Sequence, residues 1–274
     1  MVSRTKSSTT SRSSPDGSDV TTNAHIPLVT ICYNNHRYVE NTVLQAARFG
    51  IRTIILDNAS GYADTRAYLA GLQERAEVIF LPDNAGHTCW TIPSVYNRLP
   101  DRFFLSDPDL EWNPTLPADF PTILDGLRSE LQAGRIGFAL DLSDSGAMFQ
   151  DPDYVVGTSI SAWEAQFWTS RVLHPTYEIY NAPIDTTFHL FDKQNTGGRH
   201  IRLGGIFTAR HLPWYRETDI PPHDLLHMYA ASRGSTISKL VLREMARKDL
   251  VQGALDECRR KCGDSAFLSA AALT

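Results

Sequence analysis

Residues 103–114 read FFLSDPDLEWNP, a short apolar run that ends in two aspartates, Asp107 and Asp109. The run is typical of a buried strand, and residues two apart on an extended chain point to the same side. Both carboxylates can therefore face one site just beyond the carboxyl end of this strand. Pro108 lies between them and fixes its own φ, which stiffens the pair. Two carboxylates this close repel each other unless a cation lies beside them, and hard oxygen ligands suit Mg²⁺ or Mn²⁺ that carries substrate phosphates.

Taken alone, such a pair also fits a solvated acidic turn, because short matches arise by chance. The choice therefore depends on the rest of the chain, which alternates strands and helices. The predicted strands lie at residues 26–33, 52–56, 77–81, 103–105 and 135–140. The predicted helices lie at 39–50, 64–75, 87–98 (broken near Pro93) and 120–131. Strand, helix and strand at this spacing predict right-handed βαβ units and an α/β fold with a parallel sheet.

Polar clusters follow three of the predicted strands. They are Asn34-Asn35, Asp57-Asn58 and the pair of aspartates at 107 and 109. Because open α/β sheets bind ligands outside the carboxyl ends of their strands, we expect these clusters to converge on one site.

The second half of the chain shows a weaker pattern. Residues 150–215 are rich in aromatic side chains and short polar turns, which predicts a mixed α+β region over one end of the sheet. Residues 236–262 predict a final helical stretch. It carries seven basic residues: Lys239, Arg243, Arg247, Lys248, Arg259, Arg260 and Lys261. Acidic residues are mixed in, so we interpret it as a solvated helix face, with contact to a membrane surface as the alternative.

Composition narrows the classes of function. The 274 residues carry a net charge of −5 and no dense basic block, which gives no reason to expect a nucleic-acid partner. Four cysteines without a second pair of ligands predict reduced thiols rather than a zinc site. No apolar run is long enough to span a bilayer and no secretory signal opens the chain. We expect a cytoplasmic protein, with peripheral contact to the inner face of a membrane as the alternative.

Four motifs in order resemble the nucleotide-sugar-binding half of family 2-like glycosyltransferases of the GT-A fold. They are VTICYN at 29–34, ILDNAS at 55–60, DNAG at 83–86 and SDPD, a DXD motif, at 106–109. The resemblance implies a single GT-A-like domain with a mostly parallel central sheet flanked by helices and a mixed α+β acceptor half. Composition predicts a disordered tail at 1–24, because its Ser/Thr-rich residues cannot offset their own ordering entropy. The helical pattern predicts a C-terminal helical segment (236–274), and the resemblance implies a nucleotide-sugar-binding half (25–141) and an acceptor and catalytic half (142–235).

The resemblance also implies a function and a donor site. The function is transfer of a sugar, hexosyltransferase-like, from a nucleotide-diphosphate sugar to a saccharide or other hydroxyl acceptor, with Mn²⁺ or Mg²⁺. Asp109, and less directly Asp107, would hold the metal, and Asp57 would bind the base or ribose. The remaining donor residues are implied to be Thr30, Tyr33, Asn34, Asn84 and Gly86. Each also has a structural interpretation, as a strand end, a turn or an Asx-turn residue.

The resemblance implies a catalytic carboxylate after the metal motif, which takes the proton of the acceptor hydroxyl in an inverting transfer. Asp185 and Glu164 are the candidates. We favour Asp185, 76 residues past Asp109 in a turn-to-helix context, although it could instead cap a helix that begins at Thr186. His211 resembles the late histidine that some GT-A enzymes use as a metal or diphosphate ligand, and Arg210 beside it could hold phosphates. The Glu-Asp pair usual in the family is missing, which leaves inversion open.

Two other functions stay open. One is a non-catalytic nucleotide-sugar-binding protein, which would bind a nucleoside diphosphate without turnover. The other is a sugar-phosphate nucleotidylyltransferase, although residues 34–37 match poorly the Gly/Arg/Lys-rich loop expected there. The sequence contains no Walker loop, G-x-G-x-x-G or G-x-S-x-G motif, which argues against NTPases, dinucleotide oxidoreductases and serine hydrolases.

Overall fold

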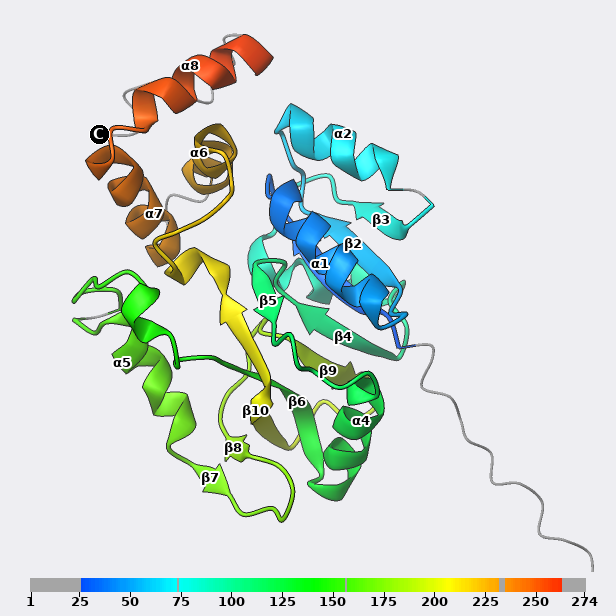
Figure 1. The fold of residues 1–274 in the computed structure, drawn as a ribbon. Coiled ribbons are helices and arrows are strands. Elements are labelled where there is room, and N and C mark those ends of the chain that lie inside the picture. Colours follow the sequence, from blue (N-terminus) through cyan, green and yellow to red (C-terminus); the bar gives the residue numbers. More distant parts are fainter. Residues whose placement is uncertain (1–25, 73, 156, 232–234, 263–274) are drawn as a thin grey trace, which may run out of the picture.

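A computed structural model describes residues 26–262, except 73, 156 and 232–234. The predicted tail at 1–24 and the end of the predicted C-terminal segment, 263–274, lie outside the described residues. Within them, ten strands form one twisted sheet with helices on both faces (Figure 1).

The first half of the sheet is parallel throughout. Its strands are β1 (Leu28–Cys32), β2 (Thr53–Asp57), β3 (Ala76–Phe80) and β4 (Arg102–Ser106), in the order β3-β2-β1-β4. All residues of β1 and β2 are buried, as expected for strands covered on both faces. The predicted α/β fold is therefore confirmed, and the carboxyl ends of these strands meet at one edge.

The second half of the sheet is mixed. β9 (His189–Asp192) lies antiparallel between β4 and β6 (Ala133–Leu140), and β10 (Arg199–His211) continues parallel to β6. β8 (Ile179–Asn181) and β7 (Arg171–Val172) complete this edge. The short β5 (Leu110–Trp112) pairs antiparallel with the end of β10. The predicted mixed half is confirmed, but no separate pattern in the sequence predicted β5 or the 13-residue β10.

Helices α1 (His36–Arg48), α2 (Ala63–Gly71) and α4 (Phe120–Glu130) match three of the predicted helices in position. α1 buries Val39, Val43 and Ala46, which lie on one face at helical spacing, and it ends before Gly50, whose φ of +66° suits glycine. The predicted break near Pro93 separates a 3₁₀ helix (Gly86–Thr91) from α3 (Pro93–Tyr96). α5 (Ile160–Ala165) and a following 3₁₀ turn (Gln166–Trp168) cover the second half.

The largest apolar core lies between α4 and the middle of the sheet. Phe104, Phe120, Phe138 and Phe188 are fully buried there, and the rings of Phe138 and Phe188 stack at 4.3 Å. Full burial of each such side chain contributes about 1.5–3 kcal/mol. This cluster holds β4, β6 and the chain before β9 together, so it fixes the strand ends that carry the site.

The C-terminal helices differ from the prediction of one helical stretch at 236–262. α7 (Thr236–Arg247) ends before Asp249, whose φ of +54° breaks the helix, and α8 (Val251–Cys262) follows. α6 (Pro222–Ala231) packs with both, so the helical unit begins earlier than residue 236. No helix in the described ranges is long and apolar enough to cross a membrane.

Candidate active site

A polar pocket of about 220 Å³ lies at the carboxyl ends of β1, β2, β3 and β4. Tyr33, Asn84, Gly86, Asp107 and Asp109, all predicted site residues, line it. The remaining lining residues are Ile31, Asn35, Asn58, His87 and Pro108. The structure therefore brings together the clusters that follow these strands, as their position in a parallel sheet leads one to expect.

Asn58 organises the loop after β3. Its side-chain amide donates to Asn84 Oδ1 (2.7 Å) and to the Gly86 carbonyl (3.0 Å), and its Oδ1 accepts from the Ala85 amide (2.8 Å). Gly86 has a φ of +72°, which glycine adopts without strain. This loop is therefore preorganised and brings its backbone to the pocket wall.

Three predicted donor-site residues lie beneath this wall. The Thr30 hydroxyl donates to the Ser106 carbonyl (2.9 Å), which ties β1 to β4. Asn34 is buried, with its Oδ1 accepting from the Tyr62 amide, and Asp57 is 3% exposed and accepts from the Ser60 amide. Burial raises the pKa of Asp57. Their observed contacts are structural, and a contact with a nucleotide stays a prediction for all three.

Asp109 meets His211 at the mouth of the pocket. Asp109 Oδ2 lies 3.4 Å from His211 Nε2, because the β5–β10 ladder places His211 opposite Leu110. Burial opposes the imidazolium form of His211, but the carboxylates of Asp109, Asp107 and Asp185 outweigh it, so the pKa of His211 is raised. The two side chains therefore lie in contact at the end of two strands.

Asp107 lies beside this pair and is held from the chain before β9. The Thr186 hydroxyl donates to Asp107 Oδ2 (2.5 Å), and the Asp107 amide donates to the Thr186 carbonyl (2.8 Å). Burial, and then the charge of Asp109, raise the pKa of Asp107. The same two hydrogen bonds place Asp185 next to the aspartate pair.

The donor atoms at this site fit a divalent cation. Asp109 Oδ1 and His211 Nδ1 are buried without a hydrogen-bond partner, and two carboxylates with one imidazole suit Mn²⁺. The ligand atoms of Asp107, Asp109 and His211 do not all lie within 4.8 Å of one another. The geometry therefore favours Asp109 and His211 as the residues that would hold the cation, with Asp107 beside them.

Asp185 is exposed and its carboxylate is preoriented. Its Oδ1 accepts from the amide (3.2 Å) and the hydroxyl (3.0 Å) of Thr187. Partial desolvation of the carboxyl group by its neighbours opposes ionisation, but these hydrogen bonds and Arg202 outweigh it, so the pKa of Asp185 is lowered. No helix begins at Thr186, because the chain continues into β9, and the predicted turn-to-helix context was wrong.

Glu164, the other predicted catalytic carboxylate, is 2% exposed. Its Oε1 accepts from Arg202 (2.7 Å), whose Nε donates to the Pro183 carbonyl (2.7 Å) and whose guanidinium lies over the Phe167 ring. Burial raises the pKa of Glu164 to about 7, against the opposing effect of Arg202. Glu164 and Arg202 thus support the segment that leads to Asp185.

Arg210 points away from the aspartate pair. Its guanidinium pairs with Glu111 (3.1 Å) and Asp144 (3.2 Å) and lies over the Tyr215 ring. Adjacent strand residues face opposite sides, which separates Arg210 from His211. A role of Arg210 in phosphate binding therefore stays a prediction that would require these pairs to open.

His87, Thr186 and Arg202 are site residues that the sequence reasoning missed. His87 directly follows Gly86, a predicted residue at a strand end, which was the available signal. Thr186 and Arg202 act through long-range contacts, for which a single sequence offers no pattern.

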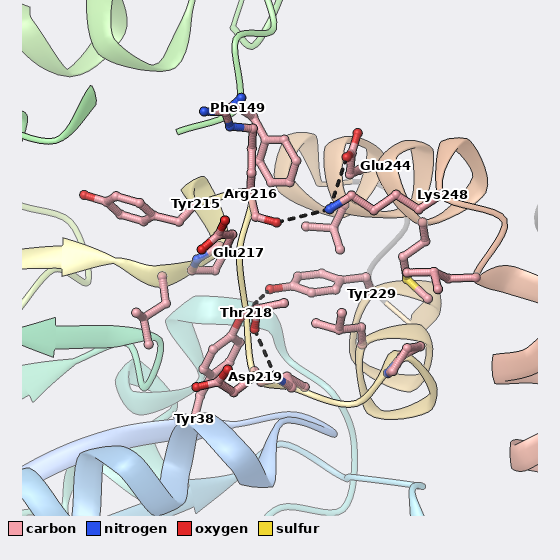
Figure 2. Close-up of a pocket in the computed structure, with 18 residues that line it drawn as sticks. Tyr38, Phe149, Tyr215, Arg216, Glu217, Thr218, Asp219, Tyr229, Glu244 and Lys248 are labelled. Atoms are coloured by element: carbon pink, nitrogen blue, oxygen red, sulfur yellow. Dashed lines mark hydrogen bonds and ion pairs between the residues drawn. The ribbon is translucent and has the colours of Figure 1, made fainter. Parts of the chain in front are cut away.

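A larger cavity of about 350 Å³ lies between the segment 215–222 and helices α6 and α7 (Figure 2). Its walls are largely apolar, and four of its polar side chains form two pairs: the hydroxyls of Tyr38 and Tyr229 (3.1 Å), and Lys248 with Glu244 (3.4 Å). None of the predicted site residues lines it. We therefore place the site in the polar pocket.

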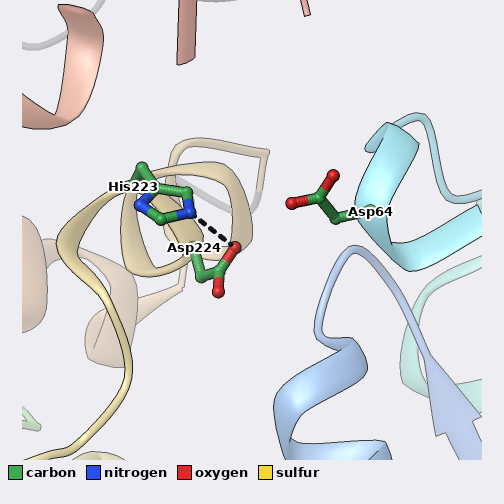
Figure 3. A group of neighbouring side chains, drawn as sticks. All are labelled: Asp64, His223 and Asp224. Atoms are coloured by element: carbon green, nitrogen blue, oxygen red, sulfur yellow. Dashed lines mark ion pairs between the residues drawn. The ribbon is translucent and has the colours of Figure 1, made fainter. Parts of the chain in front are cut away.

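Figure 3 shows a second cluster of metal-ligand types, Asp64, His223 and Asp224, whose ligand atoms lie within 4.8 Å of one another. Lys261 already supplies a cation there. Its Nζ lies 2.9 Å from Asp64 Oδ2 and 3.0 Å from His223 Nε2.

The Asp224 carboxylate of this cluster is also satisfied. It accepts from Arg37 Nε (2.9 Å) and the Tyr62 hydroxyl (2.6 Å). Hydrogen bonds from these two residues outweigh the burial of Asp224, so its pKa is lowered. The cluster joins α6 and α8 to α1 and α2, and we interpret it as an ionic clamp rather than a metal site.

No family model and no curated protein matches the chain. Among solved structures, the mannosyltransferase PcManGT from Pyrobaculum calidifontis, in complex with GDP-Man and Mn²⁺, is similar at a TM-score of 0.42 and 13% identity. The likeness covers 91% of this chain and 84% of that one. It is too distant to transfer a residue role or a substrate, so function must be argued from the site.

Proposed function

We propose that this chain is a glycosyltransferase that moves a sugar from a nucleotide-diphosphate sugar to a hydroxyl acceptor. The observation that carries the proposal is the pairing of Asp109 with His211 beside a polar pocket at the ends of parallel strands, with Asp185 exposed next to them. This reaction requires recognition of the nucleotide, stabilisation of the leaving group and a general base.

The pocket would hold the donor. Asn35, Asn58, Asn84 and the Gly86 backbone offer neutral hydrogen-bond groups for a base and ribose, and Tyr33 offers a ring. None of the described residues that line it is Lys or Arg. A diphosphate bound there therefore needs its countercharge from the cation that Asp109 and His211 would hold.

Asp109 and His211 would hold Mn²⁺ or Mg²⁺ in our proposal, and Asp107 lies beside them. Such a cation neutralises the two phosphates and thereby stabilises the departing nucleoside diphosphate. This need for a cation, rather than a basic loop, also favours a glycosyltransferase over a nucleotidylyltransferase.

Asp185 is our proposed general base. Its lowered pKa keeps it ionised at neutral pH, and its exposed carboxylate can accept the proton of an acceptor hydroxyl. Glu164 is buried against Arg202 and is the weaker candidate. A single base on the acceptor side fits an inverting transfer, which we propose here.

The direct test is turnover of a panel of nucleotide-diphosphate sugars by the purified protein with Mn²⁺, read as released nucleoside diphosphate. We expect at least one donor to be consumed, and consumption to stop with a chelator. Nucleotide binding without release from any donor, with or without acceptors, would instead support a non-catalytic binding protein.

A further inference from the structure

A second polar pocket, of about 400 Å³, lies on the acceptor half. We call it the Trp168 pocket, after the ring that lines it together with Asn113, Asp141, Ser143, Glu178 and Thr208. Its volume lies in the range of small-molecule sites. None of the residues that line the proposed donor pocket lines the Trp168 pocket.

Gly204 shapes this pocket. A Cβ at Gly204 would lie 2.9 Å from Glu178 Cδ and 3.0 Å from Trp168 Cζ3. Glycine at this position therefore leaves room for the side chains of Glu178 and Trp168. Gly205 beside it has a φ of +61°, within the register shift of β10 between Leu203 and Thr208. The irregularity in β10 thus creates the space that the pocket occupies.

The polar groups of the Trp168 pocket are held in place before any ligand arrives. The Tyr180 hydroxyl donates to Glu178 Oε1 (2.5 Å), and Tyr180 packs edge-on against the Trp168 ring (5.0 Å). Asp141 accepts from the amide (2.8 Å) and the hydroxyl (2.9 Å) of Ser143. Preorganised acceptors beside a fixed aromatic ring are the combination that binds a molecule with an apolar face and several hydroxyls.

The negative charges of the pocket narrow the class of ligand that it can bind. Neither Asp141 nor Glu178 has an ion-pair partner among the described residues, and no Lys or Arg of that part of the chain lines the pocket. An anion would be repelled, whereas hydroxyl donors form strong hydrogen bonds to carboxylates. The pocket therefore suits an uncharged polyol better than a phosphate or a nucleotide.

The Trp168 pocket lies on the face of β10 that also carries Arg202, which supports the segment before Asp185. Arg202, which contacts Glu164 and the Pro183 carbonyl, precedes Gly204 by two residues. Residues two apart on a strand share a face and lie roughly 7 Å apart. A saccharide that offers one hydroxyl to Asp185 could therefore extend a further sugar ring toward this pocket.

We propose that the Trp168 pocket binds a sugar ring of an uncharged saccharide acceptor. The assignment of the ligand as an acceptor rests on the proposed function, whereas the binding of a saccharide can be tested without it. Trp168 supplies the ring on which the sugar lies, and Asp141 and Glu178 accept hydrogen bonds from its hydroxyls.

The test uses the full chain and saturation-transfer NMR with methyl glycopyranosides of glucose, galactose, mannose and N-acetylglucosamine and with their β-linked disaccharides. We expect saturation transfer to at least one of these saccharides in the wild type. In Trp168→Ala, the affinity for that saccharide should fall at least tenfold. Ser143→Trp fills the pocket from its exposed rim and should do the same without removing a packed ring. Trp163→Ala, on the same helical segment but outside the pocket, should bind like the wild type.

Binding of nucleoside diphosphate with Mn²⁺, measured on the same samples, separates the two proposals. Nucleotide binding with no saccharide binding, or saccharide binding that survives in both pocket variants, would overturn the pocket assignment alone. Saccharide binding that depends on the pocket, in a protein that binds no nucleotide, would support the pocket and overturn the proposed function.

Discussion

At the scale of single residues, the site depends on carboxylates whose neighbours set their charge. Asp185 and Glu164 lie close enough to influence each other, yet hydrogen bonds lower the pKa of the first and burial raises that of the second to about 7. Exposure separates them further, because only Asp185 is open to an acceptor. The two carboxyl groups therefore differ both in exposure and in the ease with which they ionise.

Asp185→Asn tests the base. Asn keeps the oxygen that accepts from Thr187, but it takes no proton at neutral pH. Transfer to an acceptor should fall by about 10²- to 10⁴-fold, the usual contribution of general base catalysis. Steady-state kinetics measures this fall, while affinity for the nucleoside diphosphate should not change. Normal turnover of the Asn variant would remove Asp185 from catalysis.

Arg202→Met tests the buried ion pair. It leaves the Glu164 carboxylate buried without its cation, which typically costs about 3–5 kcal/mol of unfolding free energy. Urea unfolding of the single variant should show this loss, and adding Glu164→Gln should recover part of it. If the two substitutions are additive, the pair does not stabilise the segment before Asp185.

At the scale of elements, β6 and β9 approach too closely for any side chain between them. A Cβ at Gly137 would lie 2.0 Å from the Phe188 carbonyl oxygen and 2.7 Å from His189 Cα. Because β9 begins just after residues 185–187, this contact fixes the position of the segment that carries Asp185.

Gly137→Ala should therefore destabilise the fold by about 3 kcal/mol or more, the upper range for overpacking. Gly126→Ala is the matched control, because Gly126 lies in α4 with nothing near its Cβ position. That change should stabilise by about 0.5–1 kcal/mol. Thermal or urea unfolding of both variants measures the difference, and equal effects would show that the β6–β9 approach is not tight.

The C-terminal helices make folding sensitive to acid. The ring of His227, on α6, stacks on Tyr62 at 3.9 Å, and burial lowers the pKa of His227 to about 4. The unfolded chain takes up this proton below about pH 6.5. Between these values the unfolded state binds more protons, so stability should fall as pH falls, by at most roughly 1.4 kcal/mol per pH unit.

His227→Phe keeps a ring against Tyr62 and removes the proton site. Its unfolding free energy should depend less steeply on pH between 6.5 and 4 than that of the wild type, while the two profiles run parallel above pH 7. Urea titrations at several pH values provide the comparison. Identical slopes would mean that His227 is protonated equally in both states.

At the scale of the whole molecule, the strands and helices of the first half of the chain could be predicted from the sequence, and those of the second half only in outline. Strands at 28–32, 53–57, 76–80 and 102–106 are short apolar runs with polar ends, and buried parallel strands have that appearance. β5 and β10 were missed because their pairing joins residues about 100 positions apart and β10 is interrupted by its own register shift. Local periodicity carries no information on such contacts.

The same limit applies to the site. The convergence of Tyr33, Asn84, Gly86, Asp107 and Asp109 follows from their place at strand ends, which the sequence shows. The inward direction of Thr30 and Asp57, and the ion pairs of Arg210 and Glu164, depend on tertiary neighbours. Residue type and order were sufficient to find the edge of the sheet, but not to decide which side chains face the ligand.

The central claim is that Asp109 and His211 bind a nucleoside diphosphate through a divalent cation. The most direct measurement is calorimetric titration of nucleoside diphosphates into the protein with Mn²⁺ and with EDTA, for the wild type, Asp109→Asn and Glu111→Gln. Glu111 is the matched control, because it lies two residues on, exposed and paired with Arg210. We predict Mn²⁺-dependent binding in the wild type and in Glu111→Gln, and at least a hundredfold weaker binding in Asp109→Asn, a difference of about 2.8 kcal/mol. Binding that is equally tight in EDTA, or unchanged in a folded Asp109→Asn protein, would contradict the account.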